Sequence, residues 1–511
     1  MGTTTRRDLL RSAAALGVGL GIGIGTAPPT AAGPETGAIE DLRRRLDGTV
    51  LLPGDPGFTA ASAPANVRYR DAEPSVVAQC ASENDVVTCI QWSQENGVPP
   101  VGRGGGHSYA GFSTNNGLVL DLSQLNSIDI DYSEGTAVVG GSASNGDLLD
   151  TMQDGPFFLP AGSCLGVCIG GFTLGGGIGY NTHWAGLTCD HLLSSRVVTA
   201  SGELLEIDDS NHSDLFWAAR GGAGGSFGIH TSFTFDLQQA PEEIAYYRLD
   251  WRGAEAATAV LSAFDLLMQT APPAFNASTM AQATEVGDGG PSEAIDTFSR
   301  GQYIGPMDEL RELVGPLLEA ATPVKSTFEV MTFWDMQQLL ARSETKPHSF
   351  GDYSRYVADP IPESAMSKMV ELLTQCPSRT ETSNGQLWSL GWTGGDVVNS
   401  IGRTETAYVH RDSKYLYRPT PEWSIDTPDS VAEELVAWTN EVIAVVTPHT
   451  PNESYQNFPN LQIKDWQQQY YAENFERLVD IKTKYDDGNL FQNAQSIPPR
   501  RLVKRADAPS A

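Results

Sequence analysis

The residue types best suited to chemistry lie in two glycine-rich runs of this 511-residue chain. In the first run, residues 101–111, three glycines precede His107. Glycine strips side chains from a turn, so that backbone N–H groups can face an anionic group such as a pyrophosphate. The second run, residues 161–179, carries Cys164 and Cys168 among its glycines. Histidine and cysteine are both nucleophiles, so the two runs together predict a site that holds a cofactor and offers two groups able to bond to it.

Neither run fits the common nucleotide motifs. Both lack the strand-linked G-x-G-x-x-G spacing with an acidic residue about 20 positions further on, and neither ends in the Lys-Ser/Thr pair of a P-loop. A single glycine cluster more often marks an ordinary turn than a phosphate site. The eight histidines show no H-E-x-x-H or similar spacing, which disfavours a metalloenzyme. The paired runs therefore indicate a nucleotide bound in another way.

Four elements in order resemble the berberine bridge enzyme-like branch of the vanillyl-alcohol oxidase superfamily of FAD enzymes. The family's R-x-G-G-H-x-x-x-G element corresponds to residues 103–111 and its A-G-x-C…G-G-G-x-G element to residues 161–179. Residues 214–229 resemble its D-L-F-W-A-x-R-G-G-G-G-x-F-G-I element, and residues 471–499 its terminal signature. The resemblance runs from about residue 72 to residue 499 and implies an FAD-linked oxidoreductase.

The resemblance also implies a flavin bonded twice to the protein. His107 stands where the family attaches the flavin 8α-methyl carbon, and Cys164 where doubly tethered members bond flavin C6. The alternatives are a hydrogen-bonded structural histidine and a buried, unreactive thiol. Cys168 is a rival to Cys164, although it falls on a position that is usually glycine in the family. Two tethers would strengthen the flavin as a hydride acceptor and allow a wide cleft, which suits oligosaccharides or polycyclic natural products.

The other FAD contacts implied by the resemblance are mostly glycines. They are Arg103, Gly104, Gly105, Gly106 and Ser108 around the pyrophosphate, Gly171, Gly175, Gly176, Gly177 and Gly179 along the second run, and Gly228 with Ile229 near the adenosine. Taken singly, each glycine is only a turn residue. Ile169 resembles the position that gates oxygen access in this family, but its size does not decide between an oxidase and a dehydrogenase.

Tyr455 is the candidate general base, in a segment that resembles the family motif Y-x-N-Y-x-D. A tyrosine accepts a proton only as phenolate, so the site must lower its pKa from about 10. Phe458 replaces the second tyrosine of the motif and Asn460 its aspartate, which puts the hydrogen-bond support of the segment in doubt. The candidate helpers, for each of which packing in a core is the alternative, are Tyr109, Tyr415 and Tyr417.

The implied reaction is hydride transfer from a carbinol C–H to flavin N5, followed by reoxidation with O₂ to give H₂O₂. The substrate would be a sugar, an oligosaccharide or a secondary-metabolite alcohol. One alternative is a dehydrogenase of the same fold that uses another electron acceptor. Another is a flavin-binding protein without turnover, which would have no need of Tyr455. The sequence leaves the substrate and the oligomeric state open.

The composition is that of a globular protein, with 19% charged and 40% hydrophobic residues, and the length predicts two folding units. The formal net charge of −30 disfavours nucleic acid and anionic membrane as partners. The six cysteines form no dense disulfide framework. Cys80 and Cys89 are a candidate bridge that the sequence leaves open.

Residues 1–33 are predicted to be a twin-arginine export signal. Arg6 and Arg7 precede an apolar stretch rich in glycine and alanine, and small residues follow at 30–33. The alternative, an uncleaved anchor, needs an apolar span of roughly 20 residues. Because the twin-arginine machinery carries folded proteins, the signal suits an enzyme loaded with its cofactor before export. We therefore expect a secreted or cell-surface protein.

These residues must be positioned by a predicted α+β fold, in which a two-part PCMH-type FAD-binding domain is joined to a substrate domain with an antiparallel sheet backed by helices. The expected divisions are the signal (1–33), a lead-in (34–65), the FAD-binding domain (66–240), the substrate domain (241–450), a C-terminal segment that returns to the FAD-binding domain (451–500) and a loose tail (501–511). Residues 406–411 resemble a family strand that lines the pocket.

Overall fold

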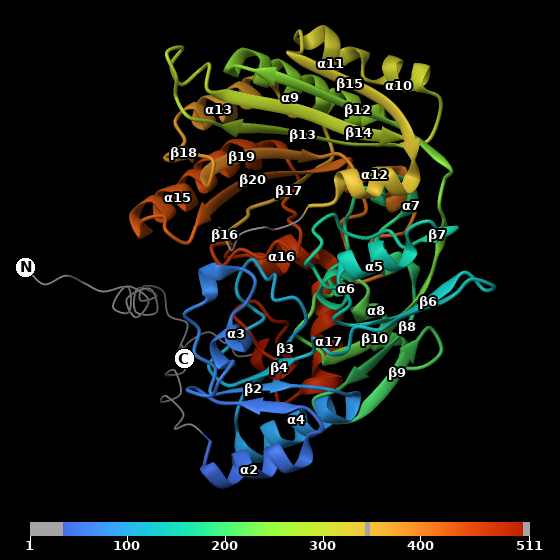
Figure 1. Cartoon of the computed structure of the whole chain (residues 1–511), viewed down its shortest axis with the longest axis vertical. Helices are drawn as coiled ribbons and strands as arrows, with labels where there is room; N and C mark the ends of the chain where they lie inside the picture. Colours follow the sequence, from blue (N-terminus) through green and yellow to red (C-terminus); the bar gives the residue numbers. More distant parts are fainter. Residues whose placement is uncertain (1–33, 343–347, 504–511) are drawn as a thin grey trace, which may run out of the picture.

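Two lobes make up the computed structural model, which describes residues 34–342 and 348–503 (Figure 1). The first lobe holds both glycine runs and the C-terminal helices, and the second lobe is built on one large sheet. The chain passes between them after β11 (Gln238–Gln239), which pairs with β7 (Phe157–Phe158). Helices and mostly antiparallel sheets in separate layers confirm the predicted α+β class.

A four-stranded sheet at the base of the first lobe carries the first glycine run. Its order is β1 (Thr49–Leu51), β2 (Val76–Gln79), β4 (Leu118–Asp121) and β3 (Pro100–Arg103), with β1 antiparallel and the others parallel. Helices α2 (Thr36–Arg45) and α4 (Glu83–Asn96) lie beneath it in Figure 1. Because β3 ends at Arg103, the glycine turn follows directly at the edge of this sheet.

The segment expected to be a lead-in is an integral part of this sheet. Leu42 of α2 is fully buried in the same hydrophobic cluster as α4, and β1 adds a strand beside β2. Helix α4 begins where Ser82 accepts a hydrogen bond from the Asp85 N–H, and it ends at Gly97 in the left-handed conformation. In this cluster the Cys80 and Cys89 sulfur atoms are 4.0 Å apart as free thiols, so they form no disulfide.

The second glycine run belongs to a five-stranded antiparallel sheet and its helices. The strand order is β5 (Ile128–Asp131), β6 (Thr136–Gly140), β10 (Ile229–Asp236), β8 (Leu192–Val198) and β9 (Leu204–Asp208). The run itself leads into α6 (Ile169–Leu174). The remaining elements of this lobe are α3 (Phe58–Ser62), η1 (Val67–Tyr69), α5 (Asn145–Met152), α7 (Thr182–Ala185), η2 (Thr188–His191), α8 (Ser213–Ala219), α16 (Trp466–Tyr471), η4 (Ala472–Asn474), α17 (Phe475–Asp486) and α18 (Arg500–Val503).

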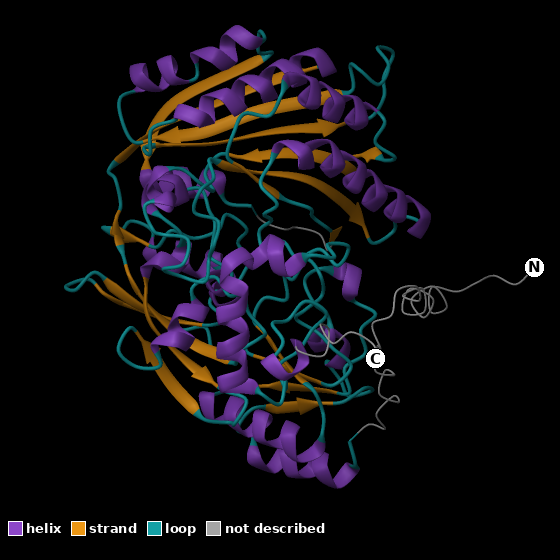
Figure 2. Ribbon diagram, turned by 180° about the vertical axis from the view of Figure 1, so that it is seen from behind, coloured by secondary structure: helices purple, strands orange, loops and turns teal. Residues whose placement is uncertain are grey.

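The second lobe is a nine-stranded antiparallel sheet with helices packed on its outer face (Figure 2). Its main strands, in spatial order, are β15 (Lys325–Thr332), β12 (Glu243–Arg252), β14 (Ile295–Tyr303), β13 (Phe275–Ala283), β19 (Ser383–Leu390), β20 (Tyr415–Ser424) and β16 (His348–Phe350), while β17 (Arg355–Val357) pairs with β20 and β18 (Arg379–Thr380) with β19. Its helices are α9 (Ala254–Thr270), α10 (Met307–Leu313), α11 (Gly315–Ala320), α12 (Phe333–Leu340), α13 (Glu363–Thr374), α14 (Asp396–Asn399), α15 (Asp429–Val446) and η3 (Thr447–His449).

The core between this sheet and its helices is the largest apolar cluster of the lobe. Alternate side chains of a strand point to opposite faces of the sheet. On β20, Tyr415 and Tyr417 therefore face the helices. Arg418 and Thr420, at the alternate positions of the same strand, face the first lobe. The same alternation fixes which residues of β19 face the first lobe.

Residues 406–411 form a buried irregular segment and not the expected pocket strand. Arg411 makes an ion pair with Asp190 of the first lobe, 2.6 Å between nitrogen and oxygen. The His410 Nδ1 lies 2.7 Å from a Glu453 carboxylate oxygen. The charged side chains of this segment thus contact the first lobe and the C-terminal segment and do not line the cavity. The segment therefore connects the second lobe to the first lobe.

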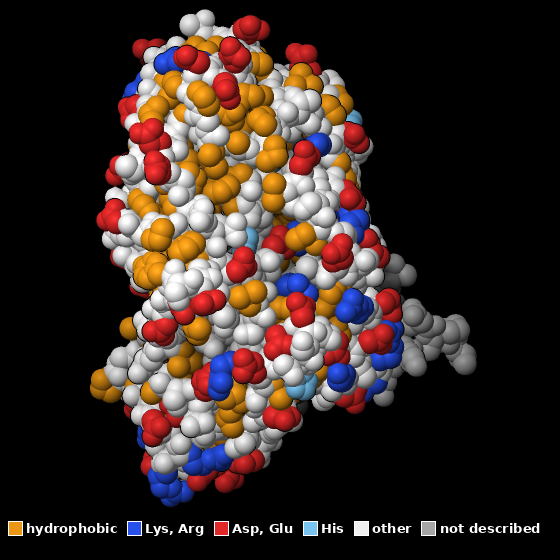
Figure 3. Space-filling model, turned by 90° about the vertical axis from the view of Figure 1, so that its right-hand side faces the viewer, with side chains coloured by type: hydrophobic (Ala, Val, Ile, Leu, Met, Phe, Trp, Pro, Cys, Tyr) orange, Lys and Arg blue, Asp and Glu red, His pale blue; other side chains and the backbone are white. Residues whose placement is uncertain are grey.

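The surface is acidic without a basic tract on the face shown in Figure 3, where Asp and Glu side chains are spread over both lobes. Basic side chains on that face lie among acidic ones. Within residues 34–342 and 348–503, no helix combines the length and apolar content needed to cross a bilayer.

Candidate functional site

A cavity of about 910 Å³ lies between the two lobes, and it is within the size range of small-molecule and cofactor sites. Its walls come from several separate parts of the chain. Both glycine runs form the side of the first lobe, β19 and β20 form the opposite side, and residues 455–459 close one end. The fold thus brings together segments that are hundreds of residues apart in the sequence.

His107 is held between the two glycine runs. A Cβ atom on Gly105 would lie 3.1 Å from the His107 Cδ2, and one on Gly166 would lie 3.1 Å from its Nε2. A side chain at either glycine would therefore press on the imidazole ring. Together with His107, the residues of the first run that line the cavity are Gly102, Gly104, Gly105, Gly106, Ser108 and Tyr109.

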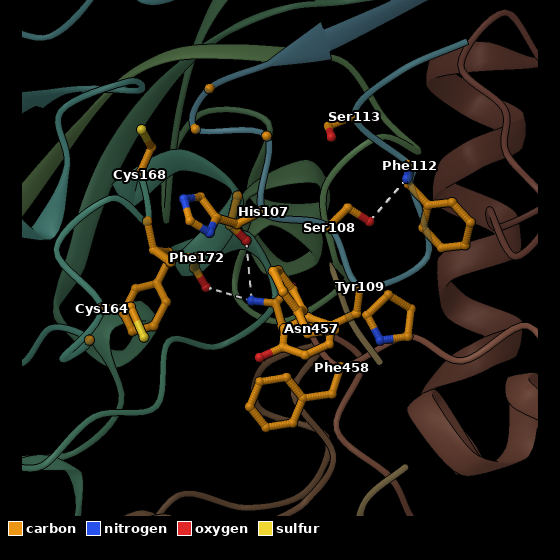
Figure 4. Close-up of a pocket in the computed structure, with 18 of the residues that line it drawn as sticks. His107, Ser108, Tyr109, Phe112, Ser113, Cys164, Cys168, Phe172, Asn457 and Phe458 are labelled. Atoms are coloured by element: carbon orange, nitrogen blue, oxygen red, sulfur yellow. Dashed lines mark hydrogen bonds between the residues drawn. The ribbon is translucent and has the colours of Figure 1, made fainter. Parts of the chain in front are cut away.

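Cys164 and Cys168 both line the cavity on one side of His107, whereas Tyr109 and Phe458 lie on the other side (Figure 4). The Cys168 thiol donates to the Ser142 carbonyl at 3.1 Å, and burial raises its pKa to about 12. A thiol that resists ionisation is a poor nucleophile. The surroundings of Cys168 thus disfavour it as the reactive cysteine.

The wall formed by the first lobe fits a long, polar nucleotide. A Cβ on Gly171 would meet no atom within 4 Å, so the cavity has room directly over that backbone. The Ser113 Oγ and Asn145 Oδ1 are buried at the lining and have no hydrogen-bond partner among residues 34–342 and 348–503. Gly228 and Ile229 complete the wall. Unpaired polar atoms beside a glycine cradle suit a ligand with many acceptors and donors, as FAD is.

Arg103 does not reach the cavity. Its guanidinium donates to the carbonyls of Ala61 and Ser62, the latter at 3.0 Å, and lies 3.9 Å from the Asp121 carboxylate. Its side chain therefore anchors the end of α3 against the glycine turn. The role of this arginine is to hold the turn from behind, and contact with a pyrophosphate would have to come from the backbone of the turn.

Four glycines of the second run serve close packing and do not line the cavity. A Cβ on Gly175 would collide with the Asn457 amide, and one on Gly176 would lie 2.7 Å from the Tyr408 ring. Gly177 faces Thr188 in the same way, and Gly179 faces the carbonyl of residue 161. Gly175 and Gly176 thus let the C-terminal segment and the second lobe approach the backbone of the run, and Gly177 and Gly179 let neighbouring segments of the first lobe approach it.

Tyr455 lines the cavity although its side chain is almost fully buried. Its Oη accepts a hydrogen bond from the Gly177 N–H at 3.1 Å and one from the Asn457 Nδ2 at 3.3 Å. Burial is the larger effect and raises the pKa of Tyr455 above its usual value, whereas these two donors act to lower it. The surroundings of Tyr455 therefore supply two hydrogen-bond donors to its oxygen, one from the backbone and one from a side chain, but they do not by themselves produce the expected lowered pKa.

The segment that carries Tyr455 is well supported despite its two departures from the family motif. The Asn457 Nδ2 donates to the carbonyls of Gly171 and Phe172, at 3.2 and 2.9 Å (Figure 4). The Asn460 amide donates to the Asp352 carbonyl at 2.8 Å. An asparagine at position 460 thus retains a structural hydrogen bond, here as a donor.

Of the three helper tyrosines, only Tyr109 lines the cavity, where its ring meets Phe350 and Phe458 edge-on. Tyr415 and Tyr417 are buried in the core beneath the helices. The Tyr415 hydroxyl donates to an Asp265 carboxylate oxygen at 2.9 Å. Strand alternation puts both of these rings on the face of β20 opposite to the cavity, so they cannot act on a ligand there.

Sequence reasoning missed the cavity wall of the second lobe. Arg418, Thr420 and Glu422 alternate along β20, and Asn384, Trp388 and Leu390 alternate along β19. Period-two spacing in these strands was the signal available in the sequence. Arg342, which follows α12, also lines the cavity. The expected gating residue Ile169 is buried in the core of the first lobe, and Val167 is the neighbouring apolar side chain that lines the cavity.

Comparison with known proteins gives the same assignment over most of the chain. Residues 74–208 match the FAD binding domain family, and residues 454–498 match the berberine and berberine-like family. The FAD-linked oxidoreductase YgaK of Bacillus subtilis is 31% identical over 90% of this chain and 98% of its own length. The glucooligosaccharide oxidase of Sarocladium strictum is 27% identical over 84% of this chain and 88% of its own length.

The fold is also that of a solved relative. The structure of Physcomitrella patens BBE-like 1 superposes with a TM-score of 0.80, at 24% identity, over 90% of this chain and 99% of that chain. This chain belongs to the berberine bridge enzyme-like family of FAD-linked oxidoreductases.

Proposed function

We propose that this protein is an FAD-dependent oxidase that acts on the carbinol C–H of a sugar, an oligosaccharide or a related alcohol. The observation that carries the proposal is the hydrogen-bonded Tyr455 Oη, placed in the same cavity as His107. Similarity to an enzyme named glucooligosaccharide oxidase supports an alcohol as substrate. A non-catalytic flavin-binding protein would not need a tyrosine hydroxyl with two donors at this place.

Each wall of the cavity has a part in the proposed reaction. Bound FAD would accept the hydride and pass both electrons to O₂, giving H₂O₂. Tyr455 takes the proton of the substrate hydroxyl, and the Gly177 N–H and Asn457 amide stabilise the phenolate that performs this step. The rings of Tyr109, Phe458 and Trp388 offer apolar faces against which a sugar ring can stack.

His107 and Cys164 are proposed to hold the flavin covalently. The glycines around His107 fix its ring between the two runs, and Cys164 lies in the same wall. After acid denaturation the protein should stay yellow, and peptide mapping should join both segments to one FAD. The His107→Ala and Cys164→Ala variants should each retain flavin through the other bond. Free FAD in the supernatant of the wild-type protein would contradict the proposal.

The oxidase function is tested by a peroxide-coupled screen of sugars, oligosaccharides and polyketide alcohols with purified holoenzyme. We expect flavin reduction under anaerobic conditions, and equal amounts of O₂ consumed and H₂O₂ formed in air. If the reduced enzyme turns over only with an artificial acceptor, the protein is a dehydrogenase. If no alcohol reduces the flavin, the oxidoreductase proposal for this substrate class is wrong.

Export through the twin-arginine pathway is part of the proposal, and it rests on the sequence of residues 1–33, which lie outside the described residues. Replacing Arg6 and Arg7 together by lysine should leave folded holoenzyme inside the cell. Secretion of the double variant at the wild-type level would contradict this assignment. Immunoblots of the medium and the cell fraction provide the measurement.

A further inference from the structure

Arg418 is an almost fully buried arginine whose guanidinium is only partly used by the protein. Its side chain is 10% exposed, and it lines the cavity from β20. Its Nε lies 3.1 Å from an Asp352 carboxylate oxygen and 3.0 Å from the Thr420 Oγ1. Within residues 34–342 and 348–503, its two terminal nitrogens donate no hydrogen bond. The group is therefore fixed at Nε and has its paired donors available.

The place of Arg418 is beside the candidate base. Its guanidinium carbon lies 4.5 Å over the centre of the Phe458 ring. The Phe458 ring is in turn 5.0 Å from the rings of both Tyr455 and Tyr109. Only the Phe458 ring would thus separate a ligand group held by Arg418 from the tyrosine proposed to accept the substrate proton.

Asp352 holds Arg418 without saturating it. The carboxyl is fully buried, lies against the Nε edge of the guanidinium and accepts a hydrogen bond from the Thr420 hydroxyl at 3.2 Å. Burial raises the pKa of Asp352 to about 7, even though Arg418 acts to lower it. An arginine fork with two parallel N–H groups matches a carboxylate in geometry as well as in charge.

Arg342, the other arginine of the cavity wall, has a different environment. Its guanidinium lies 4.0 Å from a Glu422 carboxylate oxygen and 5.7 Å from the Trp388 ring centre. Its side chain is 42% exposed, so solvent and Glu422 both screen its charge. Arg342 therefore serves as a matched control for a general effect of positive charge in the cavity.

Acidic side chains at the rim restrict which anions can enter. Glu381 and Asp426 line the cavity and are exposed, and the whole chain has a formal net charge of −30. These charges repel a polyanion at the mouth, whereas a single carboxylate can pass them and reach a buried guanidinium. The charge pattern thus favours a monoanion over a charged polymer.

We propose that Arg418 binds a carboxylate of the substrate, so that the preferred substrates are hydroxylated monocarboxylic acids such as a sugar acid with one carboxylate. This inference rests on the proposed oxidation of a carbinol in the same cavity. Arg418 orients the acid so that its carbinol faces Tyr455, and it is a specificity-determining residue. The oxidised bond is the same carbinol C–H as in a neutral substrate.

The test compares Arg418→Gln, Arg418→Lys and Arg342→Gln holoenzymes on matched substrates. The pair is cellobiose and its monocarboxylate counterpart cellobiouronic acid, with an oligogalacturonide as the polyanion. We expect Arg418→Gln to lower kcat/KM for the monocarboxylate by about 10–100-fold, because the variant loses hydrogen bonds to a charged group. The neutral substrate should change by less than about threefold, and Arg418→Lys should retain part of the preference because it keeps the charge. Arg342→Gln should affect both substrates alike.

A second measurement does not depend on turnover. Methyl glucuronide, added to the oxidised holoenzyme as a carboxylate probe, should perturb the flavin absorbance, and its Kd should rise by about 10-fold or more in Arg418→Gln. This titration separates failure of the carboxylate site from failure of the oxidase proposal, which would appear as absence of flavin reduction by any alcohol.

Three results would overturn the inference. The first is an equal loss of kcat/KM for the neutral and the carboxylate substrate in Arg418→Gln, together with an unchanged Kd for methyl glucuronide. The second is a loss of bound FAD in Arg418→Gln that Arg418→Lys restores, which would assign Arg418 to the cofactor. The third is a wild-type preference for the oligogalacturonide over the monocarboxylate.

Discussion

The two walls of the cavity are built from different parts of the polypeptide. The wall of the first lobe is largely backbone, with glycines at positions such as Gly104, Gly105 and Gly171. The wall of the second lobe consists of side chains that project from two adjacent strands, among them Trp388 and Arg418. One wall offers backbone and open space, while the other presents varied side chains at alternate positions of two strands.

This difference separates the two demands on the enzyme. Backbone contacts require particular glycines and a turn, so a wall of that kind tolerates few substitutions. A strand keeps its register when a side chain on one face is exchanged, because the ladder is formed by the backbone. If the first lobe holds the cofactor as proposed, side chains of the second lobe can change without altering how the cofactor is held.

The largest expected effect concerns Tyr455, compared with the core tyrosine Tyr415. General-base catalysis typically contributes ~10²–10⁴ in rate, so Tyr455→Phe should slow flavin reduction by about that factor with FAD attachment intact. Tyr415→Phe removes only a hydrogen bond to Asp265, which should cost about 1 kcal/mol of stability and leave reduction unchanged. Anaerobic stopped-flow and thermal unfolding measure the two. Reduction of Tyr455→Phe within about threefold of wild type would remove this residue from the role.

Two glycines of the same run should separate cofactor binding from support of the base. Gly175→Ala collides with the Asn457 amide and should slow flavin reduction by about tenfold through displacement of Tyr455, with FAD still bound. Gly171→Ala meets no protein atom within 4 Å, so it should fold normally but lower the FAD content. The ratio of flavin absorbance to protein absorbance, measured beside the reduction rate, decides between them. Identical behaviour of the two variants would contradict the division of labour within the run.

A smaller effect should appear as pH dependence of carboxylate binding. Burial raises the pKa of Asp352 to about 7. Below that pH the carboxyl is neutral and Arg418 is free to pair with the substrate, whereas above it ionised Asp352 competes for the same charge. KM for a monocarboxylate should therefore rise as the pH increases through about 7, by at most about tenfold per pH unit, and KM for the neutral counterpart should stay flat.

Other charged and titratable groups lie around Asp352, so the pH experiment needs a control variant. Arg418 and Glu422 face it from β20, Tyr109 from the first glycine run, and Arg68 from the small cavity behind it. Asp352→Asn removes only the buried carboxyl, so it should abolish the rise in KM while it keeps the preference for the carboxylate. A rise that persists in Asp352→Asn would assign the titration to another of these groups.

The second glycine run shows how far motif reading reaches. The family motifs located the glycines around His107 and the segment of Tyr455, because tight turns and close backbone approaches demand particular residue types. They did not separate Gly171, which borders the cavity, from Gly175 to Gly177, which border Asn457, Tyr408 and Thr188. A glycine is required wherever the backbone closely approaches either a ligand or another segment of the chain. Only the atoms around the glycine show which of the two it approaches.

The sequence by itself determined the α+β class, the family and the cofactor, since these depend on local turn chemistry and on motifs whose order along the chain is sufficient. Only the tertiary structure decided that Arg103 turns to α3, that Tyr415 and Tyr417 face the helices and that Arg418 faces the cavity. The face of a strand that becomes a cavity wall depends on which side the helices cover. That choice is made by packing between segments far apart in the sequence, which no single motif records.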